Sequence, residues 1–93
     1  MNVDLQKGFA LINDNDIESA KKYFTDLLNI DNENSLIYSG IATCYELSND
    51  FENAIEYFNK AINYDSDNYL FFNQLGNIYK KKFNINSNKA DLL

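Results

Sequence analysis

Few of the residue types that most often carry catalysis occur in this sequence. It has no histidine, one cysteine and three glycines, so neither a Ser/His nor a Cys/His nucleophile pair can form, and no glycine-rich phosphate loop is present. Cys44 stands beside Tyr45 in an apolar stretch, where we expect it to pack as a small apolar group. Glu52 and Glu56 lie one helical turn apart, and we interpret them as a solvated surface. The sequence therefore favours a protein that is not an enzyme and has no cofactor.

Two acidic segments, beginning at Asp14 and Asp65, have a composition that could bind calcium. A calcium-binding loop needs oxygen ligands at positions 1, 3 and 5, glycine at position 6 and glutamate at position 12. Counted from Asp14, positions 6 and 12 are Ser19 and Thr25; counted from Asp65, position 6 is Leu70. Both segments depart from the pattern, so we expect no metal site and interpret them as helix caps and linkers.

Charge and composition exclude several kinds of partner. The net charge is −6 and the isoelectric point is near 4.3, which opposes binding to phosphate backbones, and all eight basic residues are lysine, so bidentate arginine contacts are impossible. No apolar run approaches the ~18 residues of a membrane span, and the first residues do not resemble a secretion signal. The lone cysteine and the lack of Asn-x-Ser/Thr sequons are typical of intracellular proteins. We expect a cytoplasmic protein that binds neither nucleic acid nor membrane.

The elements that position these residues repeat every 34 residues. The matching pairs are Asp16/Asp50, Glu18/Glu52, Ala20/Ala54, Tyr23/Tyr57, Phe24/Phe58, Asn34/Asn68, Tyr38/Phe72, Ile41/Leu75 and Tyr45/Tyr79. So many aligned pairs indicate an internal repeat with units 1–34, 35–68 and 69–93, the last of them incomplete.

Each unit has the pattern of two helices joined by a turn. In the central unit, apolar residues follow a helical period, a polar turn at 48–50 interrupts them, and the period then resumes. The helical positions are Tyr38, Ile41, Ala42 and Tyr45 before the turn and Phe51, Ala54, Ile55, Phe58, Ala61 and Ile62 after it. Gly8, Ala42 and Gly76 occupy equivalent positions, where a small residue would let two helices approach closely.

The same reasoning places the helices along the chain. We predict helices at 3–12, capped by Asn2, and at 17–29, 35–48, 51–64 and 69–82. The last of these ends in Lys80, Lys81 and Lys82, where cations favour the helix dipole. Residues 83–87 are predicted to form a turn, followed at most by a short helix at 87–92. Five helices, or six, are therefore expected in a single all-α domain spanning residues 1–93.

The spacing resembles the tetratricopeptide repeat (TPR), with about two and a half repeats. The positions that carry the resemblance are Tyr38, Ile41, Ala42, Tyr45, Ala54, Phe58 and Ala61, and then Phe72, Leu75, Gly76 and Tyr79. The sequence departs from the family at Asn32 and Ser66, where proline is usual, and at Asp4, where an aromatic residue is usual. The resemblance implies a right-handed superhelical stack of antiparallel helix pairs.

The resemblance also implies a concave groove lined by the first helix of each unit. The residues placed there as partner-binding candidates are Leu5, Phe9, Leu36, Ser39, Thr43, Leu70, Asn73, Gln74, Asn77 and Lys81, with Asn2, Gly40 and Leu47 on the same face. Some family members hold the C-terminal carboxylate of chaperone tails with lysine, asparagine and arginine. The matching positions here are Leu5, Phe9, Gly40, Leu70 and Gln74, so we expect no such clamp.

These observations predict a non-enzymatic protein-interaction module that binds a peptide or segment of a partner protein in the groove. Apolar positions would anchor the segment, and side-chain amides would bond its backbone. Two alternatives stay open. The chain could be a structural unit that forms a homodimer through its incomplete C-terminal repeat, or a regulatory fragment of a larger protein.

Overall fold

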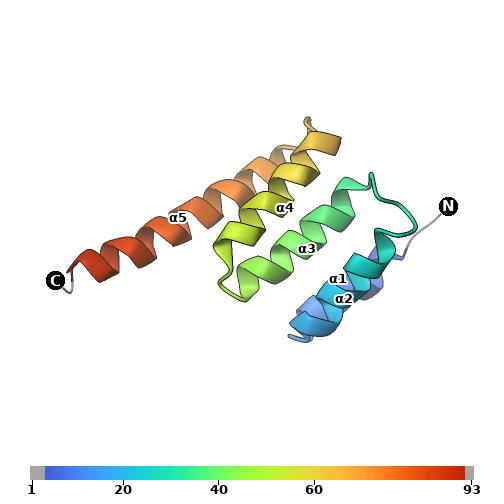
Figure 1. Cartoon of the computed structure of the whole chain (residues 1–93), viewed down its shortest axis with the longest axis horizontal. Helices are drawn as coiled ribbons and strands as arrows, with labels where there is room; N and C mark the ends of the chain where they lie inside the picture. Colours follow the sequence, from blue (N-terminus) through green and yellow to red (C-terminus); the bar gives the residue numbers. More distant parts are fainter. Residues whose placement is uncertain (1–3, 92–93) are drawn as a thin grey trace.

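The computed structural model describes the backbone of residues 4–91 and the side chains of residues 4–84. Within that range the chain forms five helices and no strand, which confirms the predicted all-α repeat stack. The helices are α1 (Leu5–Asn13), α2 (Ile17–Leu27), α3 (Ser35–Leu47), α4 (Phe51–Tyr64) and α5 (Tyr69–Asp91). Successive helices pack against one another in an elongated array of 53 × 29 × 18 Å, with the C-terminal part of α5 projecting beyond the other helices (Figure 1).

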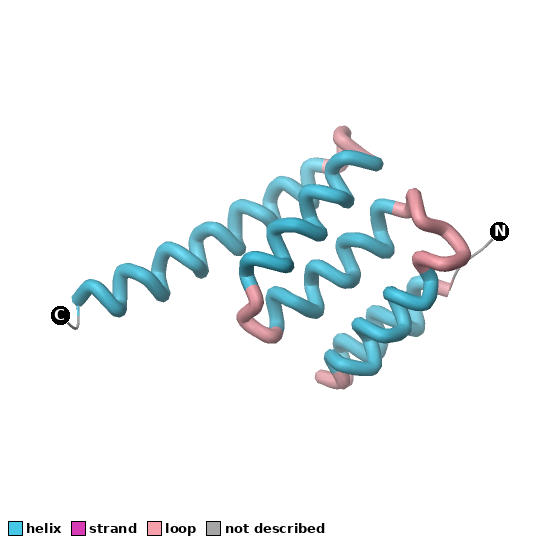
Figure 2. Tube along the Cα trace, in the orientation of Figure 1, coloured by secondary structure: helices cyan, strands magenta, loops and turns pink. Residues whose placement is uncertain are grey.

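Two tight turns define the first two helix pairs. Residues 14–16 join α1 to α2, and residues 48–50 join α3 to α4 (Figure 2). Asn15 and Asn49 lie in these turns with left-handed φ angles of 64° and 62°. Asparagine tolerates this conformation better than most residues, and the two positions are one repeat apart. Asparagine therefore reverses the chain at the same repeat position in both units.

Polar side chains cap the N-termini of α1, α3 and α4, whereas Asp16, which precedes α2, makes no side-chain cap bond, so the expected cap is not formed there. The Asn34 side chain accepts a hydrogen bond from Leu36 N at 3.0 Å, and Asp50 caps α4 in the same manner. Asp4 caps α1 by accepting from Lys7 N at 3.3 Å, so the helix begins at Leu5. The predicted cap, Asn2, and the predicted helix start at residue 3 lie outside the described residues. Asp4 departs from the repeat pattern because it serves as this cap.

The ring of Phe24 is the centre of the first helix pair. It is fully buried and lies between two glycines, Gly8 of α1 and Gly40 of α3. A β-carbon at Gly8 would lie 2.7 Å from both Cε atoms of the ring, and one at Gly40 would lie 2.7 Å from its Cζ atom. Real carbon contacts are about 3.5–4.0 Å. Both helices therefore reach this ring because they have no side chain there.

Ala42 and Phe58 repeat this contact in the second pair. Both are fully buried in a cluster with Ala54 and Ile78 that joins α3, α4 and α5. Beside the cluster, four tyrosines stack between α3 and α4. Their ring centroids are 5.5 Å apart for Tyr38 and Tyr64, 6.3 Å for Tyr38 and Tyr57, and 5.6 Å for Tyr45 and Tyr57. Small residues at close contacts, as predicted for these two units, and aromatic residues between helices thus hold the stack.

The prediction for the third unit was wrong. Helix α5 does not end at residue 82 but continues to Asp91, so the turn predicted at 83–87 and the separate helix predicted from residue 87 do not form; residue 92 lies outside the described residues. The reason is visible at Phe83, which stands where the first two units have Asn15 and Asn49. A phenylalanine is strongly disfavoured in the left-handed conformation that the turn requires, and the helix runs through it.

Two further expectations for α5 fail with that turn. Gly76 is exposed, and nothing described lies within 4 Å of a β-carbon placed there, so it is not a close helix contact. The lysines at 80–82 are inside the helix rather than at its C-terminus. Lys81 instead forms an ion pair with Glu46 of α3, and Lys82 pairs with Glu52 of α4. These pairs connect residues far apart in sequence, which helical periodicity cannot predict.

Candidate partner-binding surface

The first helices of the units, α1, α3 and α5, form one side of the stack. In Figure 1, α1 lies behind α2 and α5 behind α4, and each of these pairs is in contact. Helix α3 contacts α1 and is linked to α5 by the ion pair between Glu46 and Lys81, whose atoms are 2.6 Å apart. Residues that lie on equivalent stripes of these three helices can therefore form a continuous surface.

Exposed apolar side chains occur on these stripes. On α3, Leu36, Thr43 and Leu47 follow at intervals of seven and four residues, which places them on one face of the helix. Leu36, Leu47 and Leu70 are 42%, 51% and 56% exposed, and Phe9 of α1 is 39% exposed. Large exposed apolar residues gathered on one face are typical of contact surfaces. We call the surface formed by Phe9, Leu36, Thr43, Leu47, Leu70, Asn77 and Lys81 the inner surface.

Three of the predicted site residues expose less of their side chain to a partner than expected. Ser39 is buried, and its hydroxyl donates to the Leu36 carbonyl at 2.9 Å. Thr43 is half-buried and donates to the Ser39 carbonyl at 2.8 Å, so both hydroxyls are bonded within α3. Leu5 is half-buried and packs on the core cluster around Phe24. Ser39 therefore belongs to the interior, and Leu5 and Thr43 can offer only part of their surface.

The predicted polar residues of α5 are placed at its surface. Asn73, Gln74 and Asn77 are exposed, so their amides can reach a bound chain. Lys81 is also exposed, but its ammonium group is held by Glu46, whose side chain is only 15% exposed. The pair reduces the net charge offered by this end of the inner surface. Glu46 was not among the predicted residues, because its contact with α5 arises only in the folded stack.

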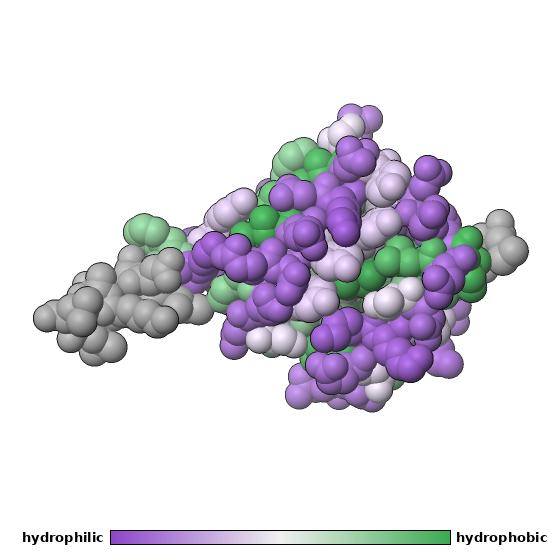
Figure 3. All heavy atoms as spheres, in the orientation of Figure 1, coloured by the Kyte–Doolittle hydropathy of each residue, from purple (hydrophilic) through white to green (hydrophobic). Residues whose placement is uncertain are grey.

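A second group of exposed side chains lies on another side of α5. Tyr69, Phe72, Tyr79 and Phe83 are 70%, 49%, 51% and 69% exposed, and hydrophobic atoms appear at the surface over α5 in Figure 3. We call these four residues the aromatic face. Phe72 and Tyr79 were predicted as packing residues of a repeat. Their exposure follows from α5 being a single helix, with none of the described residues folding back over it.

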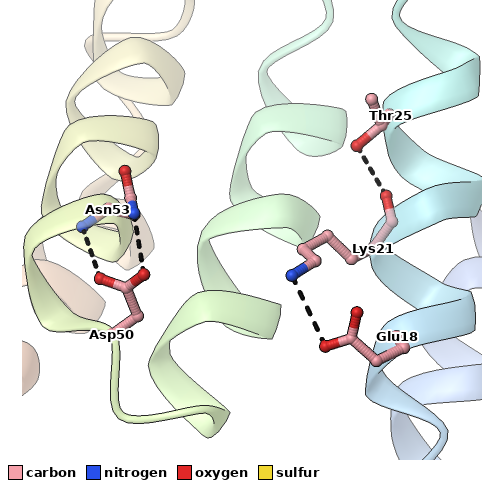
Figure 4. Close-up of polar contacts among 5 residues, drawn as sticks. All are labelled: Glu18, Lys21, Thr25, Asp50 and Asn53. Carbon is pink, nitrogen blue, oxygen red and sulfur yellow. Dashed lines mark hydrogen bonds and ion pairs between the residues drawn. The ribbon is translucent and has the colours of Figure 1, made fainter.

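The groups considered for chemistry have structural roles. Cys44 is fully buried, and burial raises the pKa of its thiol to about 11, as predicted for a packing residue. The Asp50 carboxylate accepts hydrogen bonds from Asn53 at the start of α4, and Glu18 forms an ion pair with Lys21 (Figure 4). The Glu18 and Lys21 atoms are 3.6 Å apart. The Lys21 ammonium also lies 5.0 Å from the Tyr45 ring centroid, which connects α2 to α3.

The described part of the chain contains no group of three or more His, Cys, Asp or Glu side chains arranged to hold a metal ion. None of its helices combines the length and the apolar character that a membrane crossing requires.

Comparison with known protein families agrees with the repeat seen in the structure. Residues 5–34 and residues 35–68 each match the tetratricopeptide repeat, and together they cover more than half of the chain. The boundary between the two matches coincides with the start of α3 at Ser35. No curated protein matches the sequence significantly. Repeats of this family generally mediate protein–protein interaction and typically act as non-enzymatic scaffolds. This chain belongs to the tetratricopeptide repeat family.

Proposed function

We propose that the chain is a protein-interaction module whose inner surface binds a segment of a partner protein. The observation that supports this most strongly is the exposure of Phe9, Leu36, Leu47 and Leu70 on three neighbouring helices. Burying a leucine side chain contributes about 1.5–3 kcal/mol. Three or four such anchors are enough to hold a short segment after the cost of ordering it.

Polar groups beside these anchors would orient the bound segment. Asn73, Gln74 and Asn77 present amides that can both donate and accept hydrogen bonds, which suits the backbone of an extended or helical peptide. Glu46 holds Lys81 in place at 2.6 Å. The inner surface therefore combines apolar anchors with neutral hydrogen-bonding groups, and selection among partners would depend on the spacing of their apolar residues.

Peptides selected from a displayed random library on the wild-type chain provide a test. Their affinity can be measured by fluorescence anisotropy for the wild type and for the double variant Leu36→Asp/Leu70→Asp. Losing both anchors should weaken binding by at least about 10-fold, since Leu36 and Leu70 are about half exposed and each can contribute about half of the 1.5–3 kcal/mol of a whole leucine side chain. Circular dichroism should show unchanged helicity, because both side chains are exposed.

The matched control is Ile30→Asp/Phe72→Asp. It makes the same change of chemistry at two exposed apolar residues outside the inner surface, and it should retain wild-type affinity. Equal affinity of the wild type and the Leu36/Leu70 variant would contradict the proposal. So would an equal loss in the control, because the effect would then follow from net charge.

A further inference from the structure

Gly76 occupies the same repeat position as Gly8 and Ala42, but its surroundings differ. In the first two units this position packs against an aromatic ring of the following helix, Phe24 or Phe58. At Gly76, nothing described lies within 4 Å of a β-carbon. The side of α5 that should be covered in a repeat is therefore open, and it lacks a side chain at its centre.

The aromatic face surrounds this opening in a regular pattern. Tyr69, Phe72, Gly76, Tyr79 and Phe83 are separated by three, four, three and four residues, which is the heptad spacing of helices that pair side by side. Gly76 is the midpoint between Tyr69 and Phe83. The pattern therefore has aromatic rings at both ends and a gap in the middle.

We propose that the aromatic face binds a second copy of this chain, with two α5 helices crossing antiparallel at Gly76. A two-fold interface brings each surface against its own copy. In this arrangement Gly76 meets Gly76 on the axis, and Tyr69 of each copy lies next to Phe83 of the other. The missing side chains let the helix backbones approach, and the rings close both ends of the contact.

The exposed area is sufficient for such a contact. A whole phenylalanine or tyrosine side chain buries 150–250 Å², and about half to two-thirds of each of the four rings is exposed. Pairing would bury roughly 500 Å² on each copy, or about 1,000 Å² in total, the lower limit for a specific protein interface. We therefore expect a reversible dimer that dissociates on dilution.

Charge favours the antiparallel orientation. Lys81 and Lys82 are paired with Glu46 and Glu52, so the positive charge of this part of α5 comes from Lys80, whereas the linker before α5 contains Asp65 and Asp67. Antiparallel pairing brings Lys80 of one copy toward the acidic linker of the other. Parallel pairing would place the two Lys80 side chains side by side, which costs free energy at low ionic strength. Adding salt should therefore weaken dimerisation, but the apolar contact should keep part of the affinity.

The first test is the mass of the chain, measured by light scattering from micromolar to millimolar concentration. The wild type should rise from 10.8 kDa toward twice that value. Gly76→Glu should stay at the monomer mass, because its side chain enters open space in the monomer but fills the crossing point in the dimer. Asn77→Glu, the matched control one residue away, should dimerise as the wild type does.

A wild type that stays monomeric at millimolar concentration would overturn the proposal, and the aromatic face would then belong to another occupant, such as a helix of a different protein. Equal dimerisation of wild type and Gly76→Glu would also overturn it, since the contact would lie elsewhere.

The second test concerns orientation. G76C should form a disulfide-linked dimer under mild oxidation, because the two substituted positions meet on the axis. F83C alone should not, because an antiparallel pair holds its two copies roughly 21 Å apart along the helices, at 1.5 Å per residue, which is far beyond disulfide reach. The native Cys44 is fully buried and does not compete. Efficient linkage through F83C but not G76C would show parallel pairing and refute the antiparallel arrangement.

The inner surface and the aromatic face can be tested independently. Leu36→Asp/Leu70→Asp should lose peptide binding but still dimerise, and Gly76→Glu should retain peptide binding as a monomer. Failure of one proposal therefore leaves the other intact.

Discussion

The contact between Phe24 and its two glycines leads to a prediction about Gly8 and Gly76, which occupy equivalent repeat positions. Replacing glycine by alanine should lower stability at Gly8 and raise it at Gly76. Gly8→Ala places a methyl group 2.7 Å from both Cε atoms of the Phe24 ring, about 1 Å closer than an ordinary carbon contact. The ring is fully buried, so it cannot move away without displacing its neighbours. Gly76→Ala adds the same methyl group where nothing described lies within 4 Å.

The expected magnitudes follow from two opposing terms. Overpacking a core costs about 1–3 kcal/mol, while replacing glycine by alanine inside a helix stabilises by about 1 kcal/mol. Gly8→Ala should therefore destabilise by up to about 2 kcal/mol, and Gly40→Ala by somewhat less, since its contacts with the ring are slightly longer. Gly76→Ala should stabilise by up to about 1 kcal/mol. For a chain of this size, each kcal/mol shifts Tm by about 4–8 °C.

Thermal and urea unfolding followed by circular dichroism, at concentrations where the chain is monomeric, measures these differences. The double variant Gly8→Ala/Gly40→Ala should lose less stability than the sum of the single changes, because one displacement of Phe24 relieves both. The reasoning is refuted if Gly8→Ala melts at or above the wild-type temperature, or if Gly76→Ala destabilises as much as Gly8→Ala.

Three further predictions concern other parts of the chain. Ala54→Glu should abolish cooperative unfolding, because it forces bulk and an unpaired charge into a fully buried site at a cost of several kcal/mol. For Cys44 the folded-state pKa is raised from 9.0 to about 11. The stability that the buried, protonated thiol contributes is therefore fully present below pH 9 and is lost as the pH rises to 11. Wild-type stability should fall across that window by about 2–3 kcal/mol more than in Cys44→Ala, and equal losses would contradict the shift. Phe83→Asn/Asn84→Asp restores the turn residues of the first two units, so NMR chemical shifts of residues 84–91 should lose their helical values; retention of those values would show that another feature keeps α5 continuous.

Most of the architecture could be predicted because repeat period and helical period give independent constraints on the same residues. The bounds predicted for α4, 51–64, are those of the structure, and α3 differs by one residue at its end. Both helices have a capping residue before them and an interruption after them that recur one repeat away. Helix α2 ends at Leu27 rather than at residue 29, because a turn begins at Leu28.

The end of α5 could not be predicted by applying the repeat to it. The period indicates where a turn should fall, but only the local residue decides whether the backbone can adopt it. Asn15 and Asn49 allow a left-handed φ angle, and Phe83 does not favour one. Phe83 at the turn position already indicated that the helix continues. The repeat period alone, which ignores the turn preference of that residue, predicts a turn there.

The candidate site could be predicted by helix face but not by exposure. Helical spacing placed Leu36 and Leu70 on equivalent stripes, and both are exposed. The same reasoning included Ser39, which is buried, because a residue at the edge of a stripe can lie on either side of a helix contact. The pairing of Lys81 with Glu46 depends on how far α5 lies from α3, a distance that no single-helix pattern contains.

The inner surface and the aromatic face lie on different sides of α5, so both can be occupied at the same time. Leu70 and Asn77 belong to the inner surface, whereas Tyr69 and Gly76 belong to the side on which the second copy would bind. Neighbouring residues of a helix point about 100° apart, so one contact leaves the other accessible.

A dimer formed at Gly76 would therefore carry two inner surfaces in one particle. A partner with two suitable segments would then bind its second segment at a high effective concentration, whereas a single peptide would bind equally well to monomer and dimer. Comparing one-segment and two-segment peptides on wild type and Gly76→Glu would separate these effects, because only the wild type should favour the two-segment peptide.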